Sequence, residues 1–132
     1  MVDWKRNDKL NLGHNYTDSF DFHDIARLLI MKMLRRQYPD KSKYPIYSEF
    51  DCLKQDGFPD IQMRIKGDIY VWELQKEITE KWTKEISKKY EDVTLIIVPL
   101  IDIEKKWNNK IKENPIADPL RLLKDILEPY VI

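Results

Sequence analysis

Three acidic side chains, Glu49, Asp60 and Glu73, fall on short segments whose alternation of polar and apolar residues is typical of β-strands. Because side chains alternate across a strand, Glu73 shares its face with Gln75. If the three strands are neighbours, their carboxylates meet at one edge of a sheet, where desolvation and mutual repulsion penalise the charged forms. A divalent cation relieves both penalties, and Mg²⁺ prefers oxygen ligands of this kind. The pattern therefore indicates a metal site.

The same alternation has a simpler interpretation. An antiparallel sheet with one face in water also shows polar residues between apolar ones, and Glu73 and Gln75 would then have no chemical role. Two features favour a site. The strand that carries Glu73 is expected in the middle of the sheet, where the next helix covers part of this face, and the acids gather toward one end.

The residues around the acids predict the elements that position them. Residues 66–68 predict a hairpin turn between strands at 59–66 and 69–75. A helix is predicted from residue 17 or 18 to about residue 38, ending at Pro39. The other predicted elements are a strand within 44–53, a helix at 78–90, a strand at 93–100, and helices near 102–112 and 119–128, the last with Asp118 as its cap and Pro119 at its first position.

Two apolar patterns predict what these elements bury. The first helix should bury a face that Leu28 and Ile30 widen, with its centre at Phe22, Ile25, Ala26, Leu29 and Met33. The run VTLIIVPL at 93–100 is continuous and β-branched, which is typical of a strand buried on both faces. The order helix, three strands, helix, strand and further helices predicts an α/β fold with a mixed sheet covered by helices.

Several residues resemble the motif of the PD-(D/E)XK nuclease superfamily. Pro59-Asp60 resembles the PD of that motif, and Glu73-Leu74-Gln75 resembles its (D/E)XK part, with glutamine in place of the usual lysine. Glu49 stands where many members have a further acid. The resemblance covers about residues 18–99 and implies a restriction endonuclease-like, Holliday junction resolvase-like αβββαβ core.

This resemblance implies a metal-dependent nuclease that hydrolyses DNA. Asp60 and Glu73 would bind Mg²⁺ or Mn²⁺ together with the Leu74 backbone carbonyl, and Glu49 would assist through a water. The ion would lower the pKa of a bound water and neutralise charge on the phosphate. Gln75 would hold this water by hydrogen bonding, although it lacks the positive charge of a lysine.

The chain has 23 basic and 23 acidic residues, so its net charge is zero. Binding to DNA, whether duplex, single-stranded or branched, would therefore need a local cationic surface on the protein. The candidate phosphate contacts are Lys54, Lys66, Lys81, Lys84 and Lys88. A solvated helix face, in which Glu80 and Glu85 pair with these lysines, explains the helical ones equally well.

Length and composition predict one domain: a loosely held arm at 1–16, a nuclease-like core at 17–99 and a helical extension at 100–132. The single cysteine, Cys52, excludes an internal disulfide and fits a reducing compartment. No segment approaches the ~20 apolar residues of a membrane span. We therefore expect a soluble cytoplasmic protein without a membrane partner, in the host cytoplasm if the source is a virus.

Two other functions are compatible with the sequence. One is a module with the same fold that binds nucleic acid or protein without cleavage, which the neutral net charge and Gln75 favour. The other is an interaction protein that forms a homodimer through apolar C-terminal residues, although core burial within one chain explains the same set: Leu120, Leu123, Ile126, Leu127, Tyr130 and Val131. Both histidines, His14 and His23, are interpreted as surface or capping residues.

Overall fold

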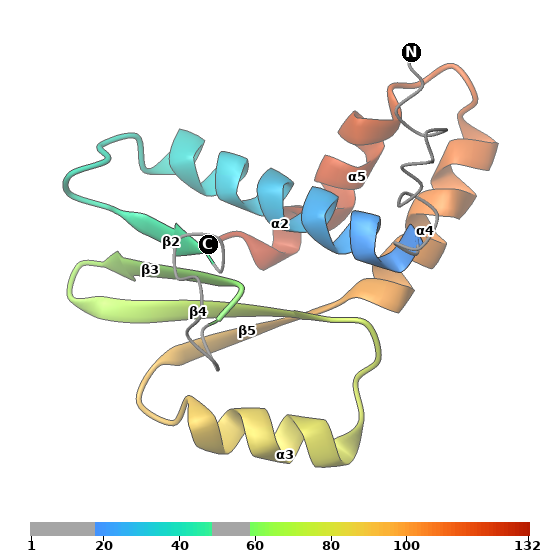
Figure 1. Cartoon of the computed structure of the whole chain (residues 1–132). Coiled ribbons are helices and arrows are strands. Elements are labelled where there is room, and N and C mark those ends of the chain that lie inside the picture. Colours follow the sequence, from blue (N-terminus) through green and yellow to red (C-terminus); the bar gives the residue numbers. More distant parts are fainter. Residues whose placement is uncertain (1–17, 49–58) are drawn as a thin grey trace, which may run out of the picture.

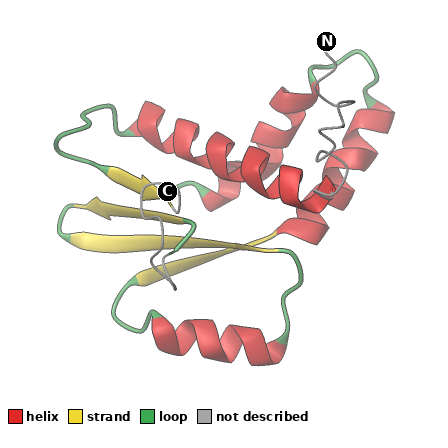
Figure 2. Cartoon of the chain, viewed as in Figure 1, coloured by secondary structure: helices red, strands yellow, loops and turns green. Residues whose placement is uncertain are grey.

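The computed structural model describes residues 18–48 and 59–132, which form a four-stranded mixed sheet flanked by helices (Figures 1 and 2). The elements in chain order are α2 (Asp18–Gln37), β2 (Ile46–Ser48), β3 (Ile61–Ile65), β4 (Asp68–Gln75), α3 (Glu80–Lys89), β5 (Thr94–Pro99), α4 (Leu100–Glu113), α5 (Pro119–Leu127) and the 3-10 turn η2 (Glu128–Tyr130). The predicted α/β class and the predicted order of elements are confirmed. The arm expected at 1–16 lies outside the described residues.

The strands of the sheet are arranged in the order β2-β3-β4-β5. The pairs β2–β3 and β3–β4 are antiparallel, whereas β4 and β5 are parallel. A parallel pair needs a crossover connection, and α3 supplies it. Figure 1 shows α3 on one side of the sheet and α2, α4 and α5 on the other. The strand that carries Glu73 is therefore a central one, as the sequence predicted.

Helix α2 packs on the sheet through a row of residues spaced four apart. Ala26, Ile30 and Leu34 are each 0% exposed, and Phe22 extends the row at its start. The expectation that Leu28 belongs to this face is wrong, because its side chain is 55% exposed. Each residue advances 100° around the helix, so Leu28 lies about 200° from Ala26 and Ile30, on the far side.

The C-terminal helices belong to the same core as the sheet. Leu123 and Leu127 of α5 are fully buried in one cluster with Trp72 and Ile103. Helix α5 begins as predicted, with the Asp118 side chain accepting a hydrogen bond from the Leu120 backbone N–H at 3.1 Å and with proline in the first turn. Most of the apolar set considered for a dimer is thus used within the chain.

Strand β5 is less buried than its sequence predicted. Val98 is fully buried, but Leu95, Ile96 and Ile97 are only partly so. The physical reason is its position at the edge of the sheet, next to β4 alone. A β-branched run therefore marks a strand here without marking burial on both faces. None of the helices in residues 18–48 and 59–132 combines the length and apolarity needed to cross a membrane.

The turn between β3 and β4 contains two residues with positive φ. Ile65 pairs with Asp68, so Lys66 and Gly67 form a two-residue loop, with φ of 51° and 89°. Positive φ at both positions is the requirement of a type I′ turn, which matches the twist of a hairpin. Glycine adopts this conformation without strain, whereas lysine does so at a cost.

We expect Lys66→Asn to stabilise the protein by about 0.5–1 kcal/mol, because asparagine tolerates the left-handed conformation better than lysine. The urea midpoint of unfolding measures this change. Lys66→Ala removes the same charge and keeps the backbone strain, so it should give no increase. Equal stabilisation by both variants would show that the lysine charge, not the backbone, is responsible.

Candidate functional site

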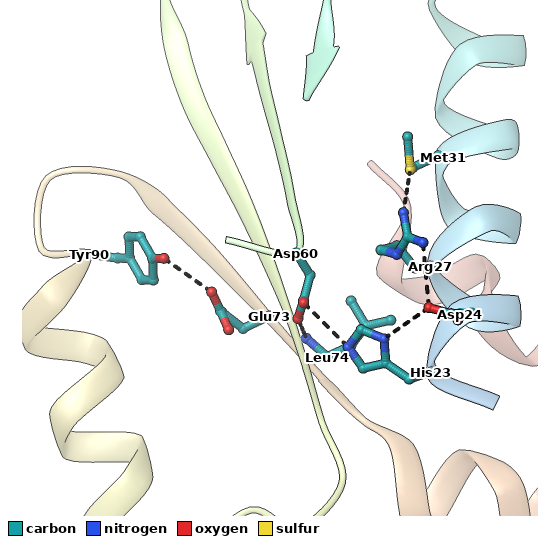
Figure 3. Close-up of polar contacts among 8 residues, drawn as sticks. All are labelled: His23, Asp24, Arg27, Met31, Asp60, Glu73, Leu74 and Tyr90. Carbon is teal, nitrogen blue, oxygen red and sulfur yellow. Dashed lines mark hydrogen bonds and ion pairs between the residues drawn. The ribbon is translucent and has the colours of Figure 1, made fainter. Parts of the chain in front are cut away.

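Asp60 is held against the strand that carries Glu73. It directly precedes β3, and its Oδ2 accepts a hydrogen bond from the Leu74 backbone N–H at 2.7 Å (Figure 3). Ile61 pairs with Trp72, so one further step along the antiparallel register sets Asp60 opposite Glu73. Since the Asp60 side chain is only 14% exposed, the hydrogen bond fixes a largely buried carboxylate at the end of the β3–β4 pair.

A histidine of helix α2 contacts the Asp60 carboxylate. His23 Nε2 lies 3.3 Å from Asp60 Oδ1, and its Nδ1 lies 3.9 Å from Asp24 Oδ1. Asp24 in turn forms an ion pair with Arg27 at 3.5 Å, and Arg27 is 1% exposed. The polar row along α2 continues with a contact of 3.8 Å between Arg27 Nη1 and Met31 Sδ (Figure 3). A chain of polar contacts thus connects the buried side of α2 to the start of β3.

The expectation that His23 is a surface or capping residue is wrong. Its side chain is 23% exposed and contacts Asp60 on another element. One sequence signal would have suggested this: His23 and Arg27 are spaced four apart, so they lie on one face, and that face adjoins the apolar row. Polar residues at such positions need partners from the element on which the helix packs.

Glu73 has its partner on the other side of the sheet. The Tyr90 hydroxyl at the end of α3 donates a hydrogen bond to Glu73 Oε2 at 3.1 Å (Figure 3). Burial raises the pKa of the Tyr90 phenol well above its usual value, and the charge of Glu73, the hydrogen bond to it and the charge of Asp60 raise it further. Both carboxylates therefore act on the same phenol. Lys89 also lies over the Tyr90 ring, with Nζ 5.1 Å from its centroid.

We expect the Tyr90 phenol to keep its proton well above pH 10, the usual tyrosine pKa being about 10. Because the folded state holds this proton more tightly than the unfolded chain, the resulting stability is complete below about pH 10 and is lost as the pH rises further. Tyrosinate absorbance during a pH titration tests this: Tyr90→Phe should reduce only the late part of the curve. A reduction in the early part would contradict the raised pKa.

The other predicted site residues lie at different distances from the two carboxylates. Gln75 is half-buried at the end of β4, on the face of Glu73. Lys81, Lys84 and Lys88 are exposed along α3. Lys66 is exposed in the hairpin turn, at the opposite end of β3, six residues and roughly 20 Å from Asp60 along the strand. It therefore does not adjoin the carboxylates.

Glu49 and Lys54, also expected at the site, lie outside the described residues. Asp60 and Glu73 are thus the two predicted carboxylates whose positions the structure gives. Across the described parts of the chain, no group of three or more His, Cys, Asp or Glu side chains is arranged to hold a metal ion.

Comparison with known proteins adds no assignment: no family model, no curated protein and no solved structure matches this chain.

Proposed function

We propose that this protein is a metal-dependent nuclease with a restriction endonuclease-like core, which hydrolyses phosphodiester bonds of DNA. The observation that carries the proposal is the hydrogen bond from the Leu74 N–H to Asp60, because it holds the acid of the Pro59-Asp60 pair beside the strand that bears Glu73. The order of a helix, three antiparallel strands, a crossover helix and a parallel strand also supports it.

The oxygen atoms at this position suit a hard divalent cation. Asp60 and Glu73 supply carboxylates, and Mg²⁺ commonly needs only one or two of these because it keeps several waters. Asp60 would exchange its contact with His23 for the ion, and the Leu74 carbonyl is the expected backbone ligand. When bound, Mg²⁺ or Mn²⁺ lowers the pKa of a coordinated water and neutralises charge on the phosphate oxygens.

The chain's own residues would then have separate roles. His23 and the Leu74 N–H hold Asp60 in the absence of metal; with the ion bound, the Leu74 N–H would continue to orient Asp60, and Tyr90 would orient Glu73 from the opposite side of the sheet. The Gln75 amide would orient a water by hydrogen bonding. Because an amide is neutral, it gives less stabilisation to a developing negative charge than a lysine does, so we expect a slow enzyme.

A module of the same fold that binds without cleavage is the second candidate. The contacts of the two carboxylates favour it: Asp60 already has His23 and the Leu74 N–H as partners, and Glu73 has Tyr90. Carboxylates satisfied in this way need no ion to offset their burial. Together with the neutral Gln75, they are compatible with a site that retains the geometry and lacks the reaction.

One experiment separates the two candidates. The protein is incubated with linear duplex, single-stranded and branched DNA in Mg²⁺, in Mn²⁺ and in EDTA, and both cleavage and retention on a gel are followed. A nuclease should cut at least one substrate with metal and none in EDTA. Retention that is independent of metal, without cleavage, would replace the proposal with the binding module. The absence of both at low salt would reject a role on DNA.

A further inference from the structure

A cavity of about 470 Å³ opens between α2 and α5. This is within the volume range of ~300–1,000 Å³ that ligand pockets have in general. The cavity is lined by residues 29–36 of α2 and 118–124 at and after the start of α5, and none of these described residues contacts Asp60 or Glu73. The cavity therefore has no part in the site described above.

The rim of this cavity is strongly cationic. Lys32 and Arg36 lie one turn apart on α2, and Arg121 and Lys124 lie one turn apart on α5. The one acidic residue in the lining, Asp118, uses its carboxylate to cap α5. Four cations against one carboxylate leave a local excess of three positive charges on a chain with a net charge of zero. This charge distribution selects an anionic occupant.

The floor of the cavity is apolar and contains no aromatic side chain. It is formed by Leu29, Met33 and Leu120, of which Leu120 is 49% exposed. Bases of nucleic acids are held by stacking on aromatic side chains, and none of the residues that line this cavity is aromatic. Leucine and methionine instead pack against aliphatic side chains, and the flexible thioether adapts to different shapes. The floor thus favours a peptide over a nucleotide.

The cavity continues into a second one, which favours an elongated occupant. The second cavity has a volume of about 440 Å³, shares Met33, Arg36 and Lys124 with the first, and reaches Gln37, Glu128 and Val131. The two cavities together therefore carry four cations against two carboxylates, which still leaves a positive excess. From Leu29 to Gln37, α2 advances by about 12 Å, at 1.5 Å per residue. A groove of this length accommodates about two turns of a helix.

We propose that this groove, lined by α2 and α5, binds an acidic amphipathic helix of a partner protein. Aliphatic side chains of that helix fill the floor at Leu29, Met33 and Leu120, while its carboxylates pair with the cations of the rim. This is helix-in-groove recognition with anchors spaced three and four residues apart. The charges on both sides of the groove add specificity and increase the association rate.

The test measures binding of a defined probe to the full chain. The probe is a fluorescent peptide of about 15 residues, long enough to form a helix, with leucines at helical spacing and glutamates elsewhere. The double variant Arg36→Gln/Arg121→Gln should weaken its binding by at least about tenfold, and Leu120→Asn by about fivefold. The matched control Lys105→Gln/Lys112→Gln changes two exposed lysines of α4 and should leave the Kd unchanged. Circular dichroism verifies that each variant folds.

Four comparisons decide the outcome. A scrambled peptide of the same composition should bind at least about fivefold more weakly, and a peptide with lysines in place of the glutamates should not bind. Equal affinity for wild type and groove variants would overturn the proposal. So would a single-stranded oligonucleotide that binds in place of the peptide and loses binding in the same variants, because the groove would then be a nucleic-acid surface. Cleavage of DNA has no bearing on this result.

Discussion

Glu73→Gln is expected to abolish metal-dependent cleavage of DNA, with the rate falling by about 10³-fold. Glutamine keeps the shape of the side chain but removes the charge that would hold the cation, and a bound ion contributes several kcal/mol to the transition state. Asp60→Asn should have a similar effect, because the amide cannot replace the carboxylate as a ligand. Rates are measured with the DNA substrate that is cut fastest in Mn²⁺.

The control for this prediction is Glu77→Gln, which makes the same change of charge at an exposed position just beyond β4. It should keep nearly full activity. Tyr90→Phe should lower the rate by a smaller factor, about 2–10-fold, since it removes only the hydrogen bond that orients Glu73. If Glu73→Gln cuts as fast as the wild type, the proposed catalytic role of this site is refuted.

Trp72→Ala should have the largest effect on stability, lowering the free energy of unfolding by about 3–5 kcal/mol. The Trp72 side chain is fully buried in the core, and its Nε1–H donates a hydrogen bond to the Tyr130 carbonyl at 2.8 Å. The substitution leaves a cavity beneath the C-terminal turn η2 and deprives that carbonyl of its donor. Urea unfolding, followed by circular dichroism, measures the loss.

Two phenylalanine variants divide this effect into its parts. Trp72→Phe keeps most of the buried ring and loses the hydrogen bond, so it should cost about 1–3 kcal/mol. Trp107→Phe removes an equivalent bond to the Pro119 carbonyl at 2.7 Å, but this one is exposed. Water can replace the lost donor there, and a cost below about 1 kcal/mol is expected. Equal costs at the two positions would show that burial of the Trp72 bond has no energetic consequence.

The elements of this fold were predictable where the determining signal is local. The start of α5 depends on the Asp118 side chain and the proline that follows it, and both act within one turn. The β3–β4 hairpin depends on Lys66-Gly67, whose positive φ angles form the two-residue loop between the paired residues Ile65 and Asp68. The burial of β5 was mispredicted because it depends on how many strands adjoin it, which its own residues do not specify.

Within the candidate site, only the contacts between neighbouring strands could be predicted from the sequence. The position of Asp60 beside β4 follows from the register of a short hairpin, which the turn determines. The contacts of His23 with Asp60 and of Tyr90 with Glu73 depend on where α2 and α3 pack on the two faces. The spacing of His23 and Arg27 indicates that His23 needs a partner, but spacing within one element does not specify which residue of another element supplies it, so the two partners became apparent only in three dimensions.

The packing of α2 against α5 also has a consequence for synthesis on the ribosome. About 80 residues separate the end of α2 from the start of α5, and translation adds about 5–20 residues per second. The surface of α2 that packs against α5 is therefore made ~4–16 s before α5 exists. During that interval the nascent chain exposes this apolar surface to chaperones and to neighbouring polypeptides. Slower elongation lengthens the exposure, so it should increase aggregation and reduce the yield of native protein.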